Sequence, residues 1–284
     1  MIQVCSDSTA DLSRELAERY HIHIIPLHVV LGDQEYRDSV DITPQEIFRW
    51  SDTHQSTPKT SAPGFYETLD FFKKILDAGD EIIAMSISSE ISTSYNVMCL
   101  AAKELKAEDR ISVIDSRNLS TGIAHLLLSA CDLANAGWAR EDIVREVRRM
   151  IPRVRTSFVV NTLVYLARGG RCNAVTAMLG GMLQLHPRIN VTDGVMTTGR
   201  SYRGRTTRMI DEYVRDLMPA LENAVPSRVF VNSAACDEEI VRAVREKIEG
   251  MHRFREVLVP TAGGVICSHC GPGTFIITYV APEN

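Results

Sequence analysis

Four short segments rich in Ser and Thr adjoin predicted strands or helices, and their hydroxyl groups are suited to binding a small anion. They occupy residues 6–9, 59–64, 86–95 and 115–116. In open α/β sheets, ligands bind beyond the carboxyl ends of the strands, where the N–H groups of helix N-termini favour negative charge. Ser, Thr and Asp are also common helix caps and turn residues. Because four such segments share this position, anion binding stands beside capping as their explanation.

The second half of the chain adds cations and an imidazole. Arg168 and Arg171 flank the Gly169-Gly170 pair, and a glycine-dense stretch, residues 263–273, is predicted to be a loop that carries His269. Glycines permit close approach of the backbone to a ligand. The alternative interpretations are a surface arginine and a structural loop histidine. A basic cluster of four arginines follows a predicted hairpin, and it is either a solvated face or a dock for an acidic partner or a phosphate: Arg200, Arg203, Arg205 and Arg208.

Other chemical motifs have weaker support. Cys267 and Cys270 form a CxxC, but a zinc site usually needs a second Cys/His pair, and Cys172 and Cys236 are isolated. We therefore predict neither a metal site nor a redox motif there. No GxGxxG or GxxxxGK[ST] occurs, so dinucleotide and P-loop sites lack their phosphate cradle. No GxSxG occurs either, which argues against an α/β-hydrolase.

The elements that must position these residues alternate in the first half of the chain. Apolar stretches predict strands at 2–5, 22–31, 81–87 and 110–114. Helices are predicted at 11–20, 63–78, 94–106, 120–136 and 141–150, with a short one opening at Thr43-Pro44. Strands separated by helices of this length predict βαβ units and a parallel sheet with helices on both faces.

The pattern changes near Arg155. Strands are predicted at 157–161, 188–192, 195–198, 228–232, 256–259 and 275–280, and helices at 163–179, 206–223 and 238–249. Asp193-Gly194 joins two β-rich stretches and is a strong hairpin signal. We therefore predict two domains, a three-layer α/β/α domain over 1–155 and a smaller two-layer α/β domain with a mixed sheet over 156–284.

Composition excludes several classes of protein. The chain has 284 residues, 45% of them hydrophobic, and a net charge of −5, which suits a globular protein and disfavours general nucleic-acid binding. Its seven cysteines lie mostly in apolar stretches, as in reduced intracellular proteins. No signal-peptide pattern and no apolar stretch long enough to span a membrane is present in the sequence. We therefore expect a cytoplasmic protein.

Six motifs, in order along the chain, resemble those of the DegV family of fatty-acid-binding proteins. They are DSTADL at 7–12, TSAP at 60–63, SSEISTSY at 88–95, DS at 115–116, GGR at 169–171 and HCGPG at 269–273. The resemblance implies a DegV-like fold, in which an α/β/α domain precedes a smaller α/β domain with a mixed sheet. It also implies a long-chain fatty acid, such as palmitate, in a tunnel between the domains. A separate ATP-dependent fatty acid kinase subunit is the implied partner, with no cofactor.

The resemblance also implies roles for particular residues. Ser61 and Ser92 would bind the fatty acid carboxylate, with Thr60 and Thr93 beside them, and two further residues would meet the head group or an acyl-phosphate: Arg171 and His269. The sequence departs from the family pattern at five positions: Ala62 for Gln, Thr93 for Gly, His186 for Lys, and cysteines at 267 and 270. The alternative is an enzyme, a transferase or hydrolase that acts on an acyl substrate through a serine hydroxyl with His269 as base.

Overall fold

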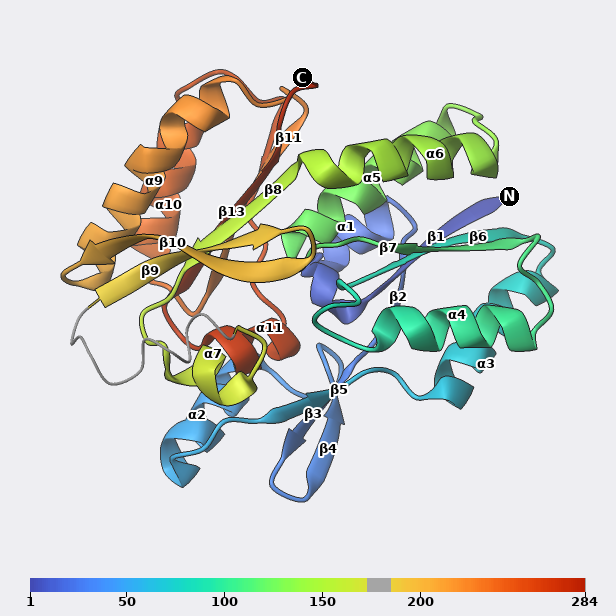
Figure 1. Cartoon of the computed structure of the whole chain (residues 1–284), viewed down its shortest axis with the longest axis horizontal. Coiled ribbons are helices and arrows are strands. Elements are labelled where there is room, and N and C mark those ends of the chain that lie inside the picture. The colour runs from blue at the N-terminus through green and yellow to red at the C-terminus, as the bar shows by residue number, and fades with distance from the viewer. Residues whose placement is uncertain (173–184, 284) are drawn as a thin grey trace.

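The computed structural model describes residues 1–172 and 185–283, and within them the chain forms three β-sheets surrounded by helices (Figure 1). One sheet has four parallel strands, one has six strands of mixed direction, and a small one has three antiparallel strands. Figure 1 shows the two larger sheets side by side, with the small sheet below them. None of the helices in these described ranges has the length and hydropathy needed to cross a membrane.

The four-stranded parallel sheet forms the middle of a three-layer arrangement. Its spatial order is β2-β1-β6-β7, with β1 at Ile2–Asp7, β2 at His23–Ile25, β6 at Glu81–Ser86 and β7 at Ile111–Asp115. Helices α3 (Phe65–Asp77) and α4 (Ser94–Glu104) cover one face, and α5 (Thr121–Asn135) and α6 (Arg140–Met150) cover the other (Figure 1). This confirms the predicted α/β/α layers. Loops at the carboxyl ends of the strands carry the Ser- and Thr-rich segments at 6–9, 86–95 and 115–116.

The six-stranded sheet has the spatial order β10-β9-β8-β13-β11-β12. The bounds are Val154–Val159 for β8, Leu185–Thr192 for β9, Val195–Arg203 for β10, Arg228–Ala234 for β11, Glu256–Leu258 for β12 and Thr274–Val280 for β13. Only the β11–β12 pair is parallel, so the sheet is mixed, as predicted. Helices α9 (Thr206–Glu222) and α10 (Glu238–Glu249) pack on its outer face. The predicted hairpin is β9–β10, and its turn residues Asp193 and Gly194 have left-handed φ of 49° and 84°.

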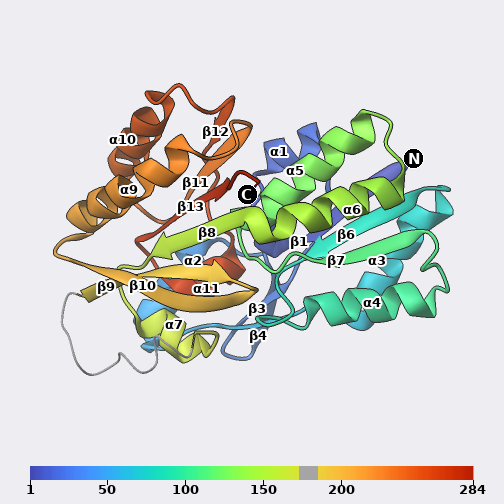
Figure 2. The same ribbon diagram turned by 45° about the horizontal axis from the view of Figure 1, so that its top comes forward.

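Helix α5 packs against both large sheets. It contacts β1 and β6 on one side and β8, β11 and β13 on the other (Figure 2). Every residue from Thr121 to Leu128 is buried, which is expected for a helix whose whole circumference is covered. The apolar core is accordingly continuous from Val4 and Ile83 in the parallel sheet, through Leu126, to Phe158 and Phe230 in the mixed sheet.

Three predictions about local structure need correction. The predicted glycine-dense loop at 263–273 is mostly helical, since Gly264–Cys270 forms helix α11. The predicted helix at 11–20 begins only at Arg14 as α1 (Arg14–Arg19), because Ser8–Ala10 forms a 3₁₀ turn that ends at Asp11 with φ of 50°. The predicted strand at 22–31 divides at Pro26, which cannot donate a ladder hydrogen bond, into β2 and β3 (His28–Leu31).

The small sheet was not predicted. It has the order β4-β3-β5, with β4 at Gln34–Arg37 and β5 at Lys59–Ser61. Along the chain, α2 (Pro44–His54) lies between β4 and β5. It begins with the expected cap: the Thr43 hydroxyl accepts from the Glu46 N–H, and the Glu46 carboxylate accepts from the Thr43 N–H. The predicted helix at 163–179 is observed as α7 (Val164–Gly169), and its part from 173 onward lies outside the described residues.

Candidate functional site

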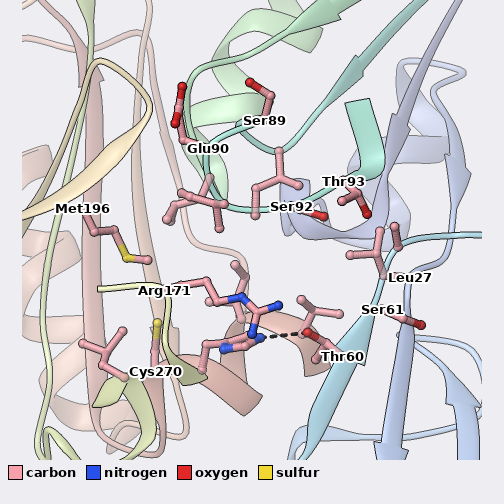
Figure 3. Close-up of a pocket in the computed structure, with 18 residues that line it drawn as sticks. Leu27, Thr60, Ser61, Ser89, Glu90, Ser92, Thr93, Arg171, Met196 and Cys270 are labelled. Carbon is pink, nitrogen blue, oxygen red and sulfur yellow. Dashed lines mark hydrogen bonds between the residues drawn. The ribbon is translucent and has the colours of Figure 1, made fainter. Parts of the chain in front are cut away.

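All six residues proposed for ligand binding line one cavity of about 460 Å³. The cavity lies where the loops of the parallel sheet, strand β5, helix α11 and the end of α7 meet (Figure 3). Its volume is within the range of about 300–1,000 Å³ that is usual for small-molecule sites. The predicted residues that line it are Thr60, Ser61, Ser92, Thr93, Arg171 and His269.

His269 lies at the polar end of the cavity, on the last turn of α11. Its Nε2 is 2.8 Å from the hydroxyl oxygen of Thr60 on β5, which joins residues 209 positions apart (Figure 3). Burial, together with the nearby charge of Arg171, lowers the pKa of His269 from 6.5 to about 4. The imidazole is therefore neutral at pH 7. Its Nδ1 is buried and has no hydrogen-bond partner among the described residues.

The Gly169-Gly170-Arg171 segment brings a cation to the same end. Gly169 ends α7, and a Cβ there would lie 2.5 Å from the Nδ1 of His269, so only glycine fits against the imidazole. Gly170 then turns the chain with a left-handed φ of 68°. The Arg171 guanidinium donates to the Gly169 carbonyl at 2.7 Å and otherwise points toward the cavity (Figure 3).

Ser92 and Thr93 stand where the chain enters α4. The Ser92 hydroxyl is 2.9 Å from that of Ser94, and it accepts the Ser94 N–H at 3.3 Å. Thr93, the cap residue, has φ of −83° and ψ of 0°, which a threonine adopts without strain, so the departure from glycine does not distort this loop. The Thr93 side chain makes no capping hydrogen bond, and it lines the cavity.

Ser61 is placed differently from the other five residues. It contributes to the lining and is exposed, as Thr93 and Arg171 are, but Figure 3 shows its hydroxyl directed away from Ser92 and Arg171. Successive side chains of a strand point to opposite faces, and in β5 Thr60 pairs with the buried Val29 while Ser61 pairs with His28. Thr60 is therefore the residue of β5 whose hydroxyl faces the polar end. The Ser61 hydroxyl therefore does not point toward that of Ser92, although both residues line the cavity.

Most of the rest of the lining is apolar and comes from both halves of the chain, and Ser89 and Glu90 are its further polar members. It was not predicted residue by residue, although five of its apolar members lie within the segments singled out from the sequence, 59–64, 86–95 and 263–273. The apolar lining residues are Leu27, Ala62, Ile87, Ile91, Leu119, Leu166, Met196, Val265 and Ile266. A cavity with one polar end and aliphatic walls is suited to an amphipathic ligand.

The turn of the β9–β10 hairpin closes against the loops of the parallel sheet. The Ser88 hydroxyl donates to the Gly194 carbonyl at 2.8 Å, and the Arg117 guanidinium donates to the Asp193 carbonyl. Arg117 also pairs with Glu90, a lining residue, at 3.0 Å. These contacts join the two halves beside the cavity, and the sequence signalled only the hairpin, not its docking.

The geometry gives less support to the alternatives of acyl-group catalysis, a reactive CxxC pair, a metal site and an arginine-lined dock. The hydroxyl within hydrogen-bond distance of His269 is that of a threonine, and no acid contacts Nδ1 within the described part of the chain. Burial raises the pKa of the Cys267 and Cys270 thiols well above its ordinary value. Within the described ranges no three His, Cys, Asp or Glu side chains form a group suited to a metal. Two arginines of the basic cluster form exposed pairs, Arg200 with Asp216 and Arg208 with Glu212.

Comparisons with known proteins agree on one family. A family model described as "Uncharacterised protein, DegV family" matches residues 1–281. Protein DegV of Bacillus subtilis is 27% identical over 279 residues, which are 98% of each chain. A solved structure titled as fatty acid binding of a DegV family protein from Thermus thermophilus is 29% identical, with a TM-score of 0.89 over 99% of both chains. A stearic acid-binding protein from Eubacterium ventriosum is 27% identical, with a TM-score of 0.85 over 99% of this chain and 98% of that one.

Proposed function

The chain belongs to the DegV family, and from this premise we propose that it binds a long-chain fatty acid, such as palmitate, in the cavity of Figure 3. The observation that carries the proposal is the division of this one cavity into a polar end and aliphatic walls. The solved relatives from Thermus thermophilus and Eubacterium ventriosum, which are described as fatty-acid-binding proteins, support it.

The aliphatic walls supply the affinity for the acyl chain. Each methylene removed from water contributes about 0.8 kcal/mol, so burial of even half of a fatty acid tail is a large favourable contribution. The walls combine Ile87, Ile91 and Leu119 of the first half with Leu166 and Val265 of the second. The tail is then held between two parts of the chain that are distant in sequence.

The polar end must satisfy the carboxylate, because an unpaired buried charge is very costly. We assign the head group to the hydroxyls of Thr60, Ser92 and Thr93 and to the guanidinium of Arg171, with which a charge-assisted hydrogen bond is strong. His269, neutral when the cavity is empty, contacts the Thr60 hydroxyl through its Nε2, and this contact can rearrange around the anion. Ser61 is assigned to the exposed rim.

We further propose that a separate ATP-dependent kinase acts on the bound carboxylate, and that this chain is a binding subunit without catalytic activity of its own. Arg171 and Ser61 at the polar end are exposed, which leaves that end accessible to another protein. A cation at this position also suits an acyl-phosphate product, since phosphorylation adds negative charge.

The direct test is native mass spectrometry of protein purified from cells, followed by denaturation to identify what co-purifies. We expect one fatty acid per chain. The double variant Thr60→Val with Ser92→Ala should lose most of the affinity for palmitate, while Ser61→Ala should not. If the double variant binds palmitate as tightly as the wild type, the head-group assignment is wrong. Turnover of ATP by this chain alone, with palmitate present, would contradict the binding-subunit role.

A further inference from the structure

Two buried aspartates contact the beginning of helix α11, the helix that carries His269. The Asp11 Oδ1 accepts the Gly263 N–H at 2.8 Å, and the Asp38 Oδ1 accepts the Gly264 N–H at 2.7 Å. The first four N–H groups of a helix have no partner within the helix, so these carboxylates satisfy donors that would otherwise be buried without one. Asp11 and Asp38 are 3% and 1% exposed, so water does not compete for these contacts.

The second oxygen of each carboxylate is also occupied. The Asp11 Oδ2 accepts from the hydroxyl of Ser120, the residue that precedes α5, and from the amide of Asn232 on β11, the latter at 2.9 Å. The Asp38 Oδ2 accepts the Ser8 hydroxyl at 2.7 Å, and Ser8 in turn accepts the N–H of Leu27, a residue that lines the cavity. The start of α11 is thereby tied to four other parts of the fold.

The glycines before α11 fit this arrangement. A Cβ on Gly264 would lie 2.8 Å from the Asp38 Oδ1 and 2.8 Å from the Ile47 Cδ1, so a larger residue would push the helix away from the carboxylate. A Cβ on Gly263 would lie 3.2 Å from the Asp11 Oδ1. The glycine pair of this segment therefore permits contact with the aspartates rather than with a ligand.

We propose that Asp11 and Asp38 are positioning residues that fix α11 in the fold and so hold the imidazole of His269 against Thr60 at the polar end of the cavity. The seven residues of α11 form a short rigid body, and a shift at its first turn moves His269 at its last turn by a similar amount. The role in ligand binding rests on the proposed function, whereas the placement of His269 can be measured without a ligand.

The test is the titration of His269 by NMR in the ligand-free protein, together with its affinity for palmitate. Wild-type protein should titrate near pH 4, because the imidazole is buried. In Asp38→Ala we expect the midpoint to move toward the ordinary value of 6.5, because α11 loosens and water reaches the ring. Palmitate affinity should fall about tenfold, as the loss of a strong polar contact does. Asp38→Asn retains an acceptor for the Gly264 N–H and should restore both properties.

Two further variants separate positioning from general loss of stability. Tyr213→Phe removes a buried hydroxyl that donates to the Ser157 carbonyl on the other side of the mixed sheet, and it should leave the His269 titration unchanged. If Asp38→Ala does not fold, Gly264→Ala must show the same shift of His269. An unchanged midpoint in folded Asp38→Ala, or in Gly264→Ala, overturns the proposal. If wild-type protein binds no fatty acid, the proposed function fails, while the titration still decides the placement of His269.

Discussion

Two polar clusters lie at opposite ends of α11. They differ in whether other groups of the protein supply their hydrogen-bond partners. At the start of the helix, both oxygens of Asp11 and of Asp38 accept hydrogen bonds from the protein itself. At its end, the Nδ1 of His269 has no partner in the described part of the chain, and the Thr93 hydroxyl makes no capping bond. The Thr93 hydroxyl and the Arg171 guanidinium, which donates to the Gly169 carbonyl and carries five N–H groups, are exposed at the cavity and can bond a ligand.

This difference gives each cluster its own experimental signature. A change in the closed cluster, around Asp11 and Asp38, should reduce stability first. A change in the open cluster, around Thr60, Ser92, Thr93, Arg171 and His269, should reduce ligand binding and leave stability nearly unchanged.

The largest effect is expected from Asp11→Ala. It leaves the Gly263 N–H, the Ser120 hydroxyl and the Asn232 amide without their acceptor, at about 1–3 kcal/mol for each buried group. We expect the free energy of unfolding to fall by about 3 kcal/mol or more, measured by urea denaturation followed by circular dichroism. A loss below about 1 kcal/mol would show that this cluster is not closed as described.

Arg171→Ala should reduce ligand affinity and leave stability nearly unchanged, the opposite of what we expect for Asp11→Ala. Hydrogen bonds to a charged group contribute about 1.5–3 kcal/mol, so palmitate affinity should fall about tenfold to a hundredfold by isothermal titration calorimetry. The melting temperature should stay within about 1 °C, because Arg171 is exposed. Arg168→Ala is the matched control: this residue is also exposed, donates to the Gln55 carbonyl and is not a lining residue. Equal losses of affinity in the two variants would refute the assignment.

The two clusters should also respond to pH in opposite directions. Burial raises the pKa of Asp11 from 3.8 to about 7, so the folded state binds the additional proton between these values and stability falls as pH rises. Burial lowers the pKa of His269 from 6.5 to about 4, so stability falls as pH drops through that window. Between pH 5 and 6, Asp11→Asn should make the slope of unfolding free energy against pH more positive, and His269→Gln should make it more negative. Slopes that change in the same direction would contradict these environments.

The smallest effect separates two neighbours on β5. Thr60→Val keeps the side-chain shape and removes the hydroxyl, and we expect palmitate affinity to fall about fivefold, the worth of a neutral hydrogen bond. Ser61→Ala should change it less than about twofold, because the exposed hydroxyl points away from the polar end. The reverse order would mean that β5 rotates when the ligand binds.

The sequence predicted the large elements well, because their signals are local. The Asp193-Gly194 turn, the Thr43-Pro44 cap and the hydrophobic periodicity of α9 and α10 each depend on neighbours in the chain. Membership of the DegV family, inferred from six ordered motifs, is confirmed over residues 1–281. The proposed site residues were found in the same way, and all of them line one cavity.

The features that the sequence did not predict depend on contacts between residues that are far apart in the chain. The stretch at 263–273 has too many glycines to read as a helix, and its helical start is stabilised by Asp11 and Asp38 more than 220 residues away. Strand β5 has three residues and little apolar character, so only its pairing with β3 defines it and turns Ser61 outward. The docking of the hairpin turn on Ser88 and Arg117 likewise leaves no local pattern.

The position of α5 between the two large sheets constrains how a ligand enters. This helix belongs to the core of both halves. Moving the two sheets apart would therefore expose apolar side chains that pack around it, such as Phe230 or Ile83. The hairpin turn, by contrast, is held by hydrogen bonds from Ser88 and Arg117 that water can replace. For the proposed ligand, we therefore infer that entry requires local opening of that turn, while the packing of α5 between the two sheets is retained.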